Sequence, residues 1–408
     1  MTRTIALLGT FDTKGHEYAF VQACIEGLGF DTFLIDVGVG ESSRLPADID
    51  AARIAESGGE SLATLRRAGD RGRAMAVMSR GVARLLPQLY GEGRFDGILA
   101  LGGSGGTSVA CAGMRELPLG VPKVMVSTVA GGDVSAYVDV QDIVMVPSIV
   151  DVSGVNRISR GVFARAAAMV CGMAGASPPP GDDRPLIVAS MFGNTTPAVG
   201  HAKSVIEARG YEVLVFHCTG TGGRTMESLI AAGMVSGVLD LTTTEWADEL
   251  VGGVFSAGPT RLEAAARRGT PAIVTPACLD MVNFGPPDTV PARFQGRVFY
   301  HHNPNVTLMR TSVEECRRLG QIIAEKLNPS VGPVSVLIPR RGWSMIDAPG
   351  GPFWLPQADA AFTEALRATL RPNIPVIELD CNVNDAEFAD RCAEELLAHL
   401  ADSLRSPR

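Results

Sequence analysis

Short apolar runs alternate with amphipathic stretches along most of this 408-residue chain. Residues 5–8 predict a strand, residues 14–28 predict a helix that ends at Gly29, and residues 31–37 predict the next strand. A strand, a helix and a further strand in this order predict a parallel sheet with helices on both faces. The chain is therefore expected to have an α/β fold built on doubly wound, Rossmann-like parallel sheets.

The same alternation continues to the middle of the chain. Residues 48–90 are charged and helical in pattern, and we expect them to form an insertion across the edge of the sheet. After this insertion, strands and helices are predicted to alternate up to a closing helix. These elements are strands at 95–101, 123–128 and 143–146, and helices at 108–116 and 158–174.

A polar, proline-rich break over residues 177–185 interrupts this pattern, which then starts again. Consecutive prolines cannot continue a helix and favour an extended linker. The first helix ends in Gly29-Phe30 in one half and in Gly210-Tyr211 in the other. We therefore predict a duplicated domain with a ligand cleft between the two copies. The predicted parts are an N-terminal domain over 1–176, a linker over 177–185 and a C-terminal domain over 186–408.

The composition argues against several classes of partner. The chain has 44 acidic and 36 basic residues and a net charge of −8, whereas nonspecific nucleic-acid binding needs a basic surface, so no native nucleic-acid partner is expected. No apolar stretch reaches the roughly 18 residues of a membrane span, and the first residues lack a signal-peptide pattern. The eight cysteines form no Cys-x-x-Cys pair, which indicates reduced thiols in a cytoplasmic protein.

Four glycines and two hydroxyl residues follow the buried strand expected at 95–101. Glycines let backbone N–H groups approach an anion, and a helix N-terminus adds partial positive charge, so this loop is a candidate site for phosphate or carboxylate. Its spacing matches neither the P-loop nor the dinucleotide fingerprint, and a tight turn without a ligand is the alternative. The six residues are Gly102, Gly103, Ser104, Gly105, Gly106 and Thr107.

A second loop follows the first strand and is expected at the same edge of the sheet. Its hydroxyls and its lysine can bind phosphate, and Asp12 can hold Mg²⁺ or cap the following helix. Asp36 ends the second strand, where it can accept from a ribose hydroxyl or cap the next turn. The nucleotide-binding candidates in the loop itself are Gly9, Thr10, Asp12, Thr13 and Lys14.

A third loop ends the strand expected at 123–128. Its small residues permit the close approach of a ligand, and Asp133 is a second candidate metal or sugar contact. Three loops with glycines and hydroxyls at one sheet edge are stronger support for a nucleotide site than any single loop. The candidates in this loop are Ser127, Thr128, Gly131 and Asp133.

Polar residues of catalytic type are dense between positions 280 and 310. Consecutive side chains of a strand point to opposite faces, so the adjacent His301 and His302 are not expected to share a metal ion; one of them can act as a general acid or base. His301, His302, Asp280 and Arg310 are the catalytic candidates. The arginines can instead form ion pairs between the domains. The substrate-binding candidates here are Asn283, Arg293, Arg297 and Asn303.

A long segment rich in glycine, proline and tryptophan covers residues 338–354. Its length without a helix or strand pattern predicts a lid or a segment that faces a cleft. Arg340 and Ser344 are candidate substrate contacts, together with Asp347. A loop that only packs the domain together, anchored by Trp343 and Trp354, is the alternative.

Several motifs in order give the chain a resemblance to a known family. They are residues 9–17, the glycine-rich loop at 102–107, and the stretches 122–128, 191–197 and 299–311. Over essentially the whole chain they resemble the bacterial, archaeal and fungal family that is related to the N-terminal domain of the tomato mosaic virus resistance protein. That plant domain binds ATP and inhibits viral RNA replication, but its antiviral activity depends on a viral partner and does not carry over.

The resemblance implies two Rossmann-like subdomains, a homodimer, and ATP and Mg²⁺ bound at residues 9–14, 102–107 and 127–133. It also implies a separately encoded barrel-domain protein as a partner, because the plant protein continues into such a region. The favoured function is an ATP–Mg²⁺-dependent enzyme that acts on a small anionic metabolite held between the domains. A non-catalytic ATP-binding regulatory protein and a nucleotide-independent hydrolase or lyase that uses His301, His302 and Asp280 are the alternatives.

Overall fold

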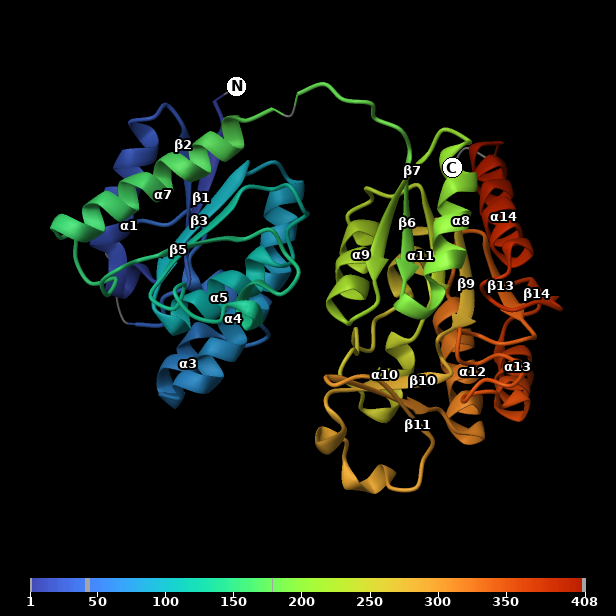
Figure 1. Cartoon of the computed structure of the whole chain (residues 1–408). Helices are drawn as coiled ribbons and strands as arrows, with labels where there is room; N and C mark the ends of the chain where they lie inside the picture. The colour runs from blue at the N-terminus through green and yellow to red at the C-terminus, as the bar shows by residue number, and fades with distance from the viewer. Residues whose placement is uncertain (1, 41–44, 178, 406–408) are drawn as a thin grey trace. The chain divides into compact units, whose positions relative to one another are not determined.

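The computed structural model describes residues 2–40, 45–177 and 179–405. Of residues 404 and 405 it describes the backbone only. The chain divides into two compact units, Met1–Pro180 and Gly181–Arg408, and each is described by itself (Figure 1). The division falls within residues 177–185, the stretch that the sequence predicts as a linker; residue 178 of that stretch lies outside the described part. The expected cleft between the two halves stays a prediction.

Five parallel strands form the sheet of the first unit in the order β2-β1-β3-β4-β5. From β1 the chain runs to β2 on one side and later returns to β3 on the other, which is the flavodoxin-like form of a doubly wound sheet. This confirms the fold class predicted for this half. The strands are β1 (Thr4–Gly9), β2 (Asp31–Asp36), β3 (Gly97–Gly102), β4 (Lys123–Ser127) and β5 (Val144–Pro147).

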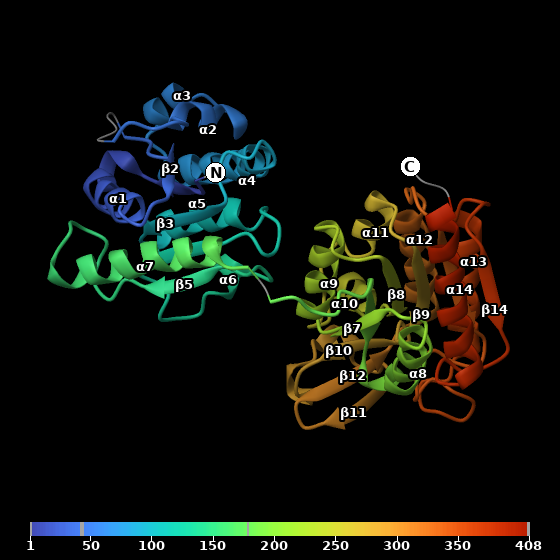
Figure 2. The ribbon, with the colours of Figure 1, turned by 90° about the horizontal axis from the view of Figure 1, so that it is seen from above.

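Helices cover both faces of this sheet (Figure 2). Side chains alternate along β1, so Ile5 and Leu7 pack with α1 and α7, whereas Ala6 and Leu8 pack with α2, α4 and α5. The helices are α1 (Phe11–Glu26), α2 (Ala51–Ser57), α3 (Leu62–Ala68), α4 (Arg71–Gly91), α5 (Ser104–Met114), α6 (Ser135–Val138) and α7 (Arg157–Gly175).

Two features of this unit differ from the sequence-based expectation. Residues 48–90 contain α2, α3 and α4, and the buried side chains of α4 pack on the sheet, so this segment connects β2 to β3 across a face rather than adding to the edge. The helices α1 and α5 begin at Phe11 and Ser104, several residues before the expected starts. Most of the predicted glycine-rich loop is therefore the first turn of a helix, despite the low helix propensity of glycine.

Tyr18 ties α1 to the two central strands of the first unit. Its hydroxyl donates to the Leu8 carbonyl at 2.5 Å and accepts from the Leu101 N–H at 2.7 Å. Burial raises the pKa of Tyr18, so the hydroxyl stays protonated. A Cβ at Gly9 would overlap the Tyr18 ring, which explains the glycine at the end of β1.

Six parallel strands form the large sheet of the second unit in the order β14-β13-β9-β8-β6-β7. Five of them repeat the strand order of the first unit, and β14 extends the sheet at one edge. The shared order confirms a second doubly wound domain and supports the predicted duplication. The strands are β6 (Leu186–Met191), β7 (Glu212–His217), β8 (Gly237–Thr242), β9 (Ala272–Ala277), β13 (Val334–Pro339) and β14 (Val376–Leu379).

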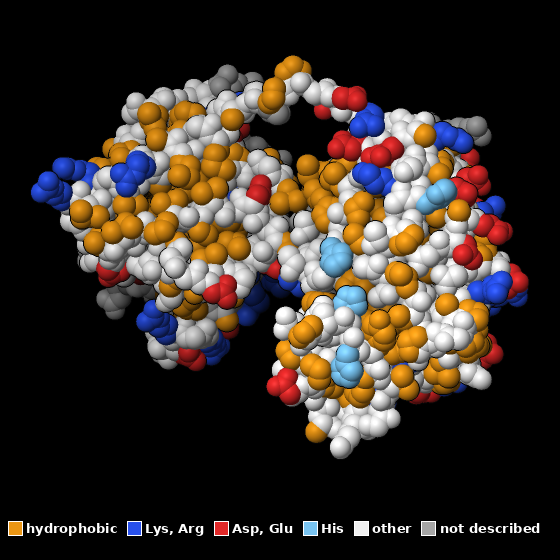
Figure 3. Space-filling view, in the orientation of Figure 1, with side chains coloured by type: hydrophobic (Ala, Val, Ile, Leu, Met, Phe, Trp, Pro, Cys, Tyr) orange, Lys and Arg blue, Asp and Glu red, His pale blue; other side chains and the backbone are white. Residues whose placement is uncertain are grey.

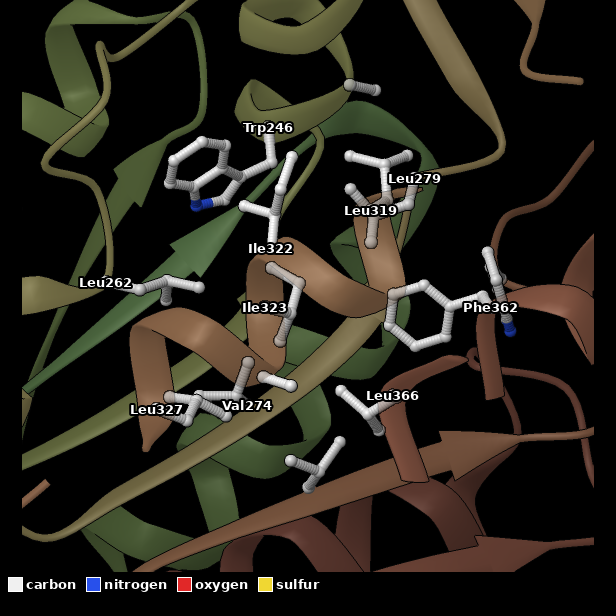
Figure 4. Close-up of a cluster of buried hydrophobic side chains, with 14 of the residues drawn as sticks. Trp246, Leu262, Val274, Leu279, Leu319, Ile322, Ile323, Leu327, Phe362 and Leu366 are labelled. Atoms are coloured by element: carbon white, nitrogen blue, oxygen red, sulfur yellow. The ribbon is translucent and has the colours of Figure 1, made fainter. Parts of the chain in front are cut away.

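The second unit also buries both faces of its large sheet. Residues of α8 and α14 pack on one face, and α9, α10, α11, α12 and α13 contribute to the core on the other, where Trp246, Ile323 and Phe362 are buried together (Figure 4). The short 3₁₀ helix η1 (Gly193–Thr195) precedes α8. The helices are α8 (Thr196–Glu207), α9 (Thr221–Ala231), α10 (Glu245–Val251), α11 (Glu263–Arg268), α12 (Val313–Leu327), α13 (Pro356–Thr369) and α14 (Ala386–Arg405).

An antiparallel sheet of three strands is inserted between β9 and α12, and the sequence analysis did not predict it. Its order is β10-β12-β11, with two 3₁₀ helices between β10 and β11. Among the described helices of either unit, none has the length and apolar character to span a bilayer. The added elements are β10 (Met281–Phe284), η2 (Pro287–Thr289), η3 (Ala292–Phe294), β11 (Phe299–Asn303) and β12 (Val306–Arg310).

Replacement of the buried tyrosine hydroxyl should destabilise the first unit. Tyr18→Phe leaves the Leu101 N–H and the Leu8 carbonyl without this partner, and we expect a loss of about 1–3 kcal/mol in the free energy of unfolding. Urea unfolding of the whole chain measures it. Tyr90→Phe is the matched control, since that partly buried ring packs on Phe95, and its effect should stay within about 0.5 kcal/mol. Equal stability of the two variants would contradict the bridging role of Tyr18.

Candidate functional site

The first unit contains a cavity of about 520 Å³ at the carboxyl ends of β1 and β3. Doubly wound sheets bind ligands where neighbouring strands lead to opposite sides, and β1 and β3 form that point here. Five parts of the unit line the cavity: the turn from β1 into α1, the segment after β2, the turn from β3 into α5, the elbow between α3 and α4, and the loop before α7. Two of these segments are loops that the sequence predicted as nucleotide-binding.

Asp12 lies in the wall of this cavity. One of its carboxylate oxygens, Oδ2, accepts from the Gly40 N–H at 2.6 Å, while Oδ1 is buried without a hydrogen-bond partner among the described residues. A Cβ at Gly38 would lie 2.6 Å from the carboxylate, so glycine makes room for it. Asp12 does not cap α1, because Thr10 holds that position. A carboxylate oxygen without a partner suits a hard cation such as Mg²⁺.

Lys14 contacts both the cavity and the loop before α7. Its side chain lines the cavity, and its ammonium group donates to the Val152 carbonyl oxygen. Its backbone is not helical, with φ −123° and ψ 22°, so α1 is kinked at this residue. The hydroxyls of Thr10 and Thr13, which also line the cavity, are joined by a hydrogen bond of 2.9 Å. The first loop thus supplies one ammonium and two hydroxyl groups.

The start of α5 presents backbone N–H groups to the cavity. Gly103 is the N-cap residue and provides no side-chain cap, and residues 103–106 all line the cavity. The first N–H groups of a helix have no partner within the helix and readily bind anions. Gly102 packs on this first turn, where a Cβ would lie 3.0 Å from the backbone. Thr107 points away from this role, since its buried hydroxyl bonds to the Ser127 hydroxyl at 2.7 Å.

The elbow between α3 and α4 supplies cavity residues that the sequence analysis missed. Arg71 is exposed at the rim, and Arg66 donates to the carbonyls of Val39 and Gly40. Their only signal in the sequence was the charge of the 48–90 segment. Apolar side chains also line the cavity, and Met75 lies against Gly105 at the start of α5. The apolar lining residues are Val37, Val39, Leu65, Met75, Met78 and Val109.

Eight of the predicted nucleotide contacts are not among the residues that line the cavity: Gly9, Asp36, Gly102, Thr107, Ser127, Thr128, Gly131 and Asp133. Asp36 is buried, and its Oδ1 accepts from the N–H groups of Phe11 and Gly38 at 3.0 and 2.8 Å, so it holds the turns around it, as in the alternative role considered for it. Ser127 is buried on Thr107, and Thr128 donates its N–H to the Gly102 carbonyl at 3.2 Å. The structure therefore brings the first and second predicted loops together, but adds only a supporting contact from the third.

Asp133, the second predicted metal ligand, is exposed together with Gly131. Its Oδ1 accepts from the Ser135 N–H at 2.9 Å, and hydrogen bonds from the Ser135 side chain and N–H hold the pKa of the carboxyl below its usual range. The carboxylates that do line the cavity besides Asp12 are those of Asp70 and Asp151. The metal pair predicted from the sequence is thus not assembled in the structure.

In the second unit, Arg310, one of the predicted catalytic residues, is the centre of a buried ionic cluster. Its guanidinium donates to the Phe353 carbonyl and to Asp359, both at 2.7 Å, and lies 3.7 Å from Asp347. Asp280 is fully buried and accepts from the Ser344 hydroxyl at 2.8 Å.

Burial raises the pKa of Asp280, and burial raises the pKa of Asp359 to about 7. Because Phe353, Ser344 and Asp347 belong to the predicted lid segment 338–354, their contacts with Arg310 and Asp280 anchor that segment to the fold.

Cys278 is also fully buried at the end of β9, and burial raises the pKa of its thiol, which makes it a poor nucleophile.

His301 and His302 are both exposed on β11, an edge strand of the inserted sheet. Asp280, their predicted catalytic partner, is buried on Ser344, so the structure does not join the three in one site. Asn303 is exposed as well, and its side-chain oxygen accepts from the Asn305 N–H at 2.8 Å. The geometry therefore lends no support to the predicted hydrolase or lyase centre.

The remaining predicted substrate contacts have structural partners. Asn283 is buried and donates to Asp248 through its backbone and side-chain N–H groups, at 2.6 and 3.0 Å. Arg297 forms a 2.6 Å ion pair with Glu315. Arg293 donates to the Val251 carbonyl at 3.1 Å, and the exposed Arg340 lies 3.5 Å from Asp380. These arginines bind residues of their own unit.

A carboxylate of the second unit occupies the anion position at the start of α9. Glu245 Oε1 accepts from the N–H groups of Gly220 and Gly223, at 2.8 and 3.1 Å. Its other oxygen pairs with Arg261 at 2.8 Å, and Arg261 also binds Asp240 at 2.5 Å and Glu227 at 3.1 Å. Glu245 is the first residue of α10, which follows β8 as α5 follows β3 in the first unit. The second unit therefore has a carboxylate where the first unit has the glycine-rich turn that opens into a cavity.

Comparisons with known proteins identify the relatives of the chain. The N-terminal domain of the uncharacterised protein family UPF0261 matches residues 3–179, and the C-terminal domain of that family matches residues 184–400. The UPF0261 protein of Clostridium tetani is 48% identical over 97% of this chain and 99% of its own length.

The tomato ToMV resistance protein Tm-1 is 41% identical over 80% of this chain and 44% of its own length. Among solved structures, the UDP-GlcNAc 2-epimerase of Methanocaldococcus jannaschii is 10% identical over 67% of this chain and 83% of its own, with a TM-score of 0.23. A structural likeness this low carries no argument about function.

Loss of Arg261, which pairs with three carboxylates, should destabilise the second unit in a pH-dependent way. Arg261→Met leaves three carboxylates without their shared cation, and we expect the free energy of unfolding to fall by about 3–5 kcal/mol at pH 7. Burial raises the pKa of Glu227 and the Arg261 guanidinium lowers it, so removal of the arginine raises that pKa further, and the deficit should shrink as the pH falls toward 4.

Urea unfolding of the whole chain at several pH values checks this. Arg267→Met is the control, because Arg267 is exposed in an ion pair with Glu263, and its loss should cost less than about 1 kcal/mol at any of these pH values. An Arg261→Met protein as stable as the control at pH 7 would contradict the proposed dependence on Arg261.

Proposed function

The chain belongs to the uncharacterised protein family UPF0261, and on this premise we propose that its first unit binds ATP together with Mg²⁺. The observation that carries the proposal is the cavity of about 520 Å³. In it, an uncapped helix start, a lysine, an arginine and a carboxylate with an unpartnered oxygen surround one space. Adenosine rather than another nucleoside is what the family resemblance of the sequence implies.

The phosphate groups fit at the start of α5. The N–H groups of residues 104–106 lie in the first turn of an 11-residue helix, where backbone donors and the helix dipole both favour an anion. Lys14 and Arg71 line the same cavity and add two positive charges. Charge-assisted hydrogen bonds from such groups are shorter and stronger than bonds between neutral groups. These polar groups of the cavity therefore match a chain of phosphates.

The base fits against the apolar lining residues. Met75, Met78 and Val109 line the cavity from α4 and α5, and Leu65 lines it from α3. Methionine side chains adapt to the shape of a flat ring and make favourable contacts between sulfur and aromatic groups. A cavity lined by both apolar and cationic side chains suits a molecule that combines a ring with phosphates.

The metal ion fits at Asp12. Its Oδ1 is buried without a partner among the described residues, and such an oxygen costs free energy unless a ligand binds it. Mg²⁺ is usually held by one or two carboxylates together with phosphate oxygens and water, so Asp12 with a nucleotide is a sufficient donor set. The bound ion would neutralise phosphate charge, and Asp151 is the second carboxylate available in the lining.

The geometry supports nucleotide binding more strongly than any particular reaction. The residues expected to hold an anionic metabolite, such as Arg297 and Arg310, are engaged in ion pairs inside the second unit. An ATP-binding protein that regulates or assembles is therefore the conclusion that the site supports best. An ATP-dependent enzyme would need substrate contacts other than these arginines.

ATP should raise the melting temperature of the whole chain, because a ligand that binds only the folded state stabilises it. Arg71→Met and Lys14→Met each remove one phosphate contact and should weaken ATP binding by roughly tenfold, the equivalent of about 1.4 kcal/mol. Arg73→Met is the matched control: it lies on α4 near Arg71, pairs with Glu60 and is not part of the cavity lining. Isothermal titration calorimetry measures all three affinities.

The same titrations, with and without Mg²⁺, are carried out on the wild type, Asp12→Asn and Asp133→Asn. Mg²⁺ should strengthen ATP binding to the wild type and to Asp133→Asn, and should have little effect on Asp12→Asn. No binding of ATP at millimolar concentration, or an Arg71→Met affinity equal to that of Arg73→Met, would contradict the proposed site.

A further inference from the structure

A second cavity, of about 280 Å³, lies on the inserted sheet of the second unit. It is formed by β11 and β12 together with the segment that carries η2 and η3, so every lining residue comes from the insertion between β9 and α12. No part of the nucleotide site proposed above contributes to it. The insertion thus brings a cavity of its own to the second unit.

The walls of this cavity are mostly apolar. Pro287, Val290 and Pro291 form one side, and Phe294 and Phe299 contribute aromatic rings. Prolines have a fixed φ and so stiffen the segment that carries them. Phe294 packs on Phe284 of β10 with ring centroids 5.4 Å apart, which holds the segment against the sheet. The pocket is therefore largely preformed.

Three polar residues line the cavity: Thr307, which is buried, and His301 and Gln295, which are exposed. Thr307 and His301 are register partners on β12 and β11, so both side chains leave the sheet on the same face, the one that lines the cavity. Thr307 is 1% exposed, and its hydroxyl has no hydrogen-bond partner among the described residues. His301 is exposed. Figure 3 shows histidine side chains, in pale blue, on one face of the second unit.

We infer that this cavity is a binding site for a small, uncharged ring compound that carries one hydroxyl or amino group. An apolar cavity of about 150 Å³ already holds benzene, so the present volume is enough for one substituted ring. A single polar group on the ring would bond to the Thr307 hydroxyl, whose lack of a partner costs free energy in the free protein. His301 would close over the edge of the ring.

The lining excludes the ligand class proposed for the first unit. None of the residues that line this cavity, all of them described, is Asp, Glu, Lys or Arg. A phosphate or carboxylate group would lose its hydration here without gaining a charged partner. The two cavities therefore serve different chemistry, and this inference stands whether or not the first unit binds a nucleotide.

Phenol and toluene are the probes, since they have nearly the same shape and differ by one hydroxyl. Histidine ring signals of the isotope-labelled whole chain are followed by NMR, with His301→Gln and His302→Gln used for assignment. Phenol should shift the His301 signals in a saturable way and leave those of His302 unchanged, because only His301 lines the cavity. Shifts of both rings together, or no saturable shift up to about 10 mM phenol, would overturn the proposal.

Two variants separate the parts of the site. Thr307→Val keeps the shape but removes the hydroxyl, and should weaken phenol binding by about three- to tenfold while toluene binding is unchanged or improved. Ala292→Trp fills the cavity from an exposed position at its rim and should abolish the binding of both probes. Equal phenol affinity in the wild type and Thr307→Val, or binding that persists in Ala292→Trp, would overturn the assignment.

Discussion

The N–H groups at the start of a helix need an acceptor, and both units meet this constraint at the carboxyl edge of a doubly wound sheet. In the second unit the acceptor is internal: Glu245 bonds to Gly220 and Gly223, and Arg261 balances its charge. In the first unit the start of α5 has no side-chain cap and opens into a cavity. By strand order α9 is not the counterpart of α5, because α9 follows β7 and α5 follows β3. The counterpart of the glycine-rich turn is the turn after β8, where the second unit carries Glu245, so one copy of the fold has a carboxylate where the other has glycines.

The other charged groups follow from the same division. The second unit uses its arginines to hold segments together: Arg310 binds the 338–354 segment and α13, and Arg261 joins three carboxylates around the sheet edge. The first unit keeps Lys14 and Arg71 at the cavity, where Lys14 has a carbonyl partner and Arg71 is exposed. The pocket on the inserted sheet has no charged residue in its lining and takes part in neither of these two uses of charge.

Much of the fold and part of the site could be predicted from the sequence. The alternation of strand and helix patterns gave both doubly wound sheets, and the residue types at positions 9–14 and 102–107 led to the two loops that meet at the cavity. Arg71 was missed because one arginine of a charged helix looks like any solvated residue. Asp280 and Arg310 were assigned to catalysis because the sequence did not reveal that they are buried. Their burial depends on packing between distant segments, which a local pattern does not encode.

The number of nucleotides bound per chain tests the central claim most directly. Equilibrium dialysis of labelled ATP with Mg²⁺ against the whole chain should saturate at one ATP per chain, because the second unit has the carboxylate of Glu245 where the first unit has the glycine-rich turn. Two ATP molecules per chain would show that this internal carboxylate does not exclude a ligand. No bound ATP at millimolar concentration would show that the cavity at the start of α5 serves another purpose.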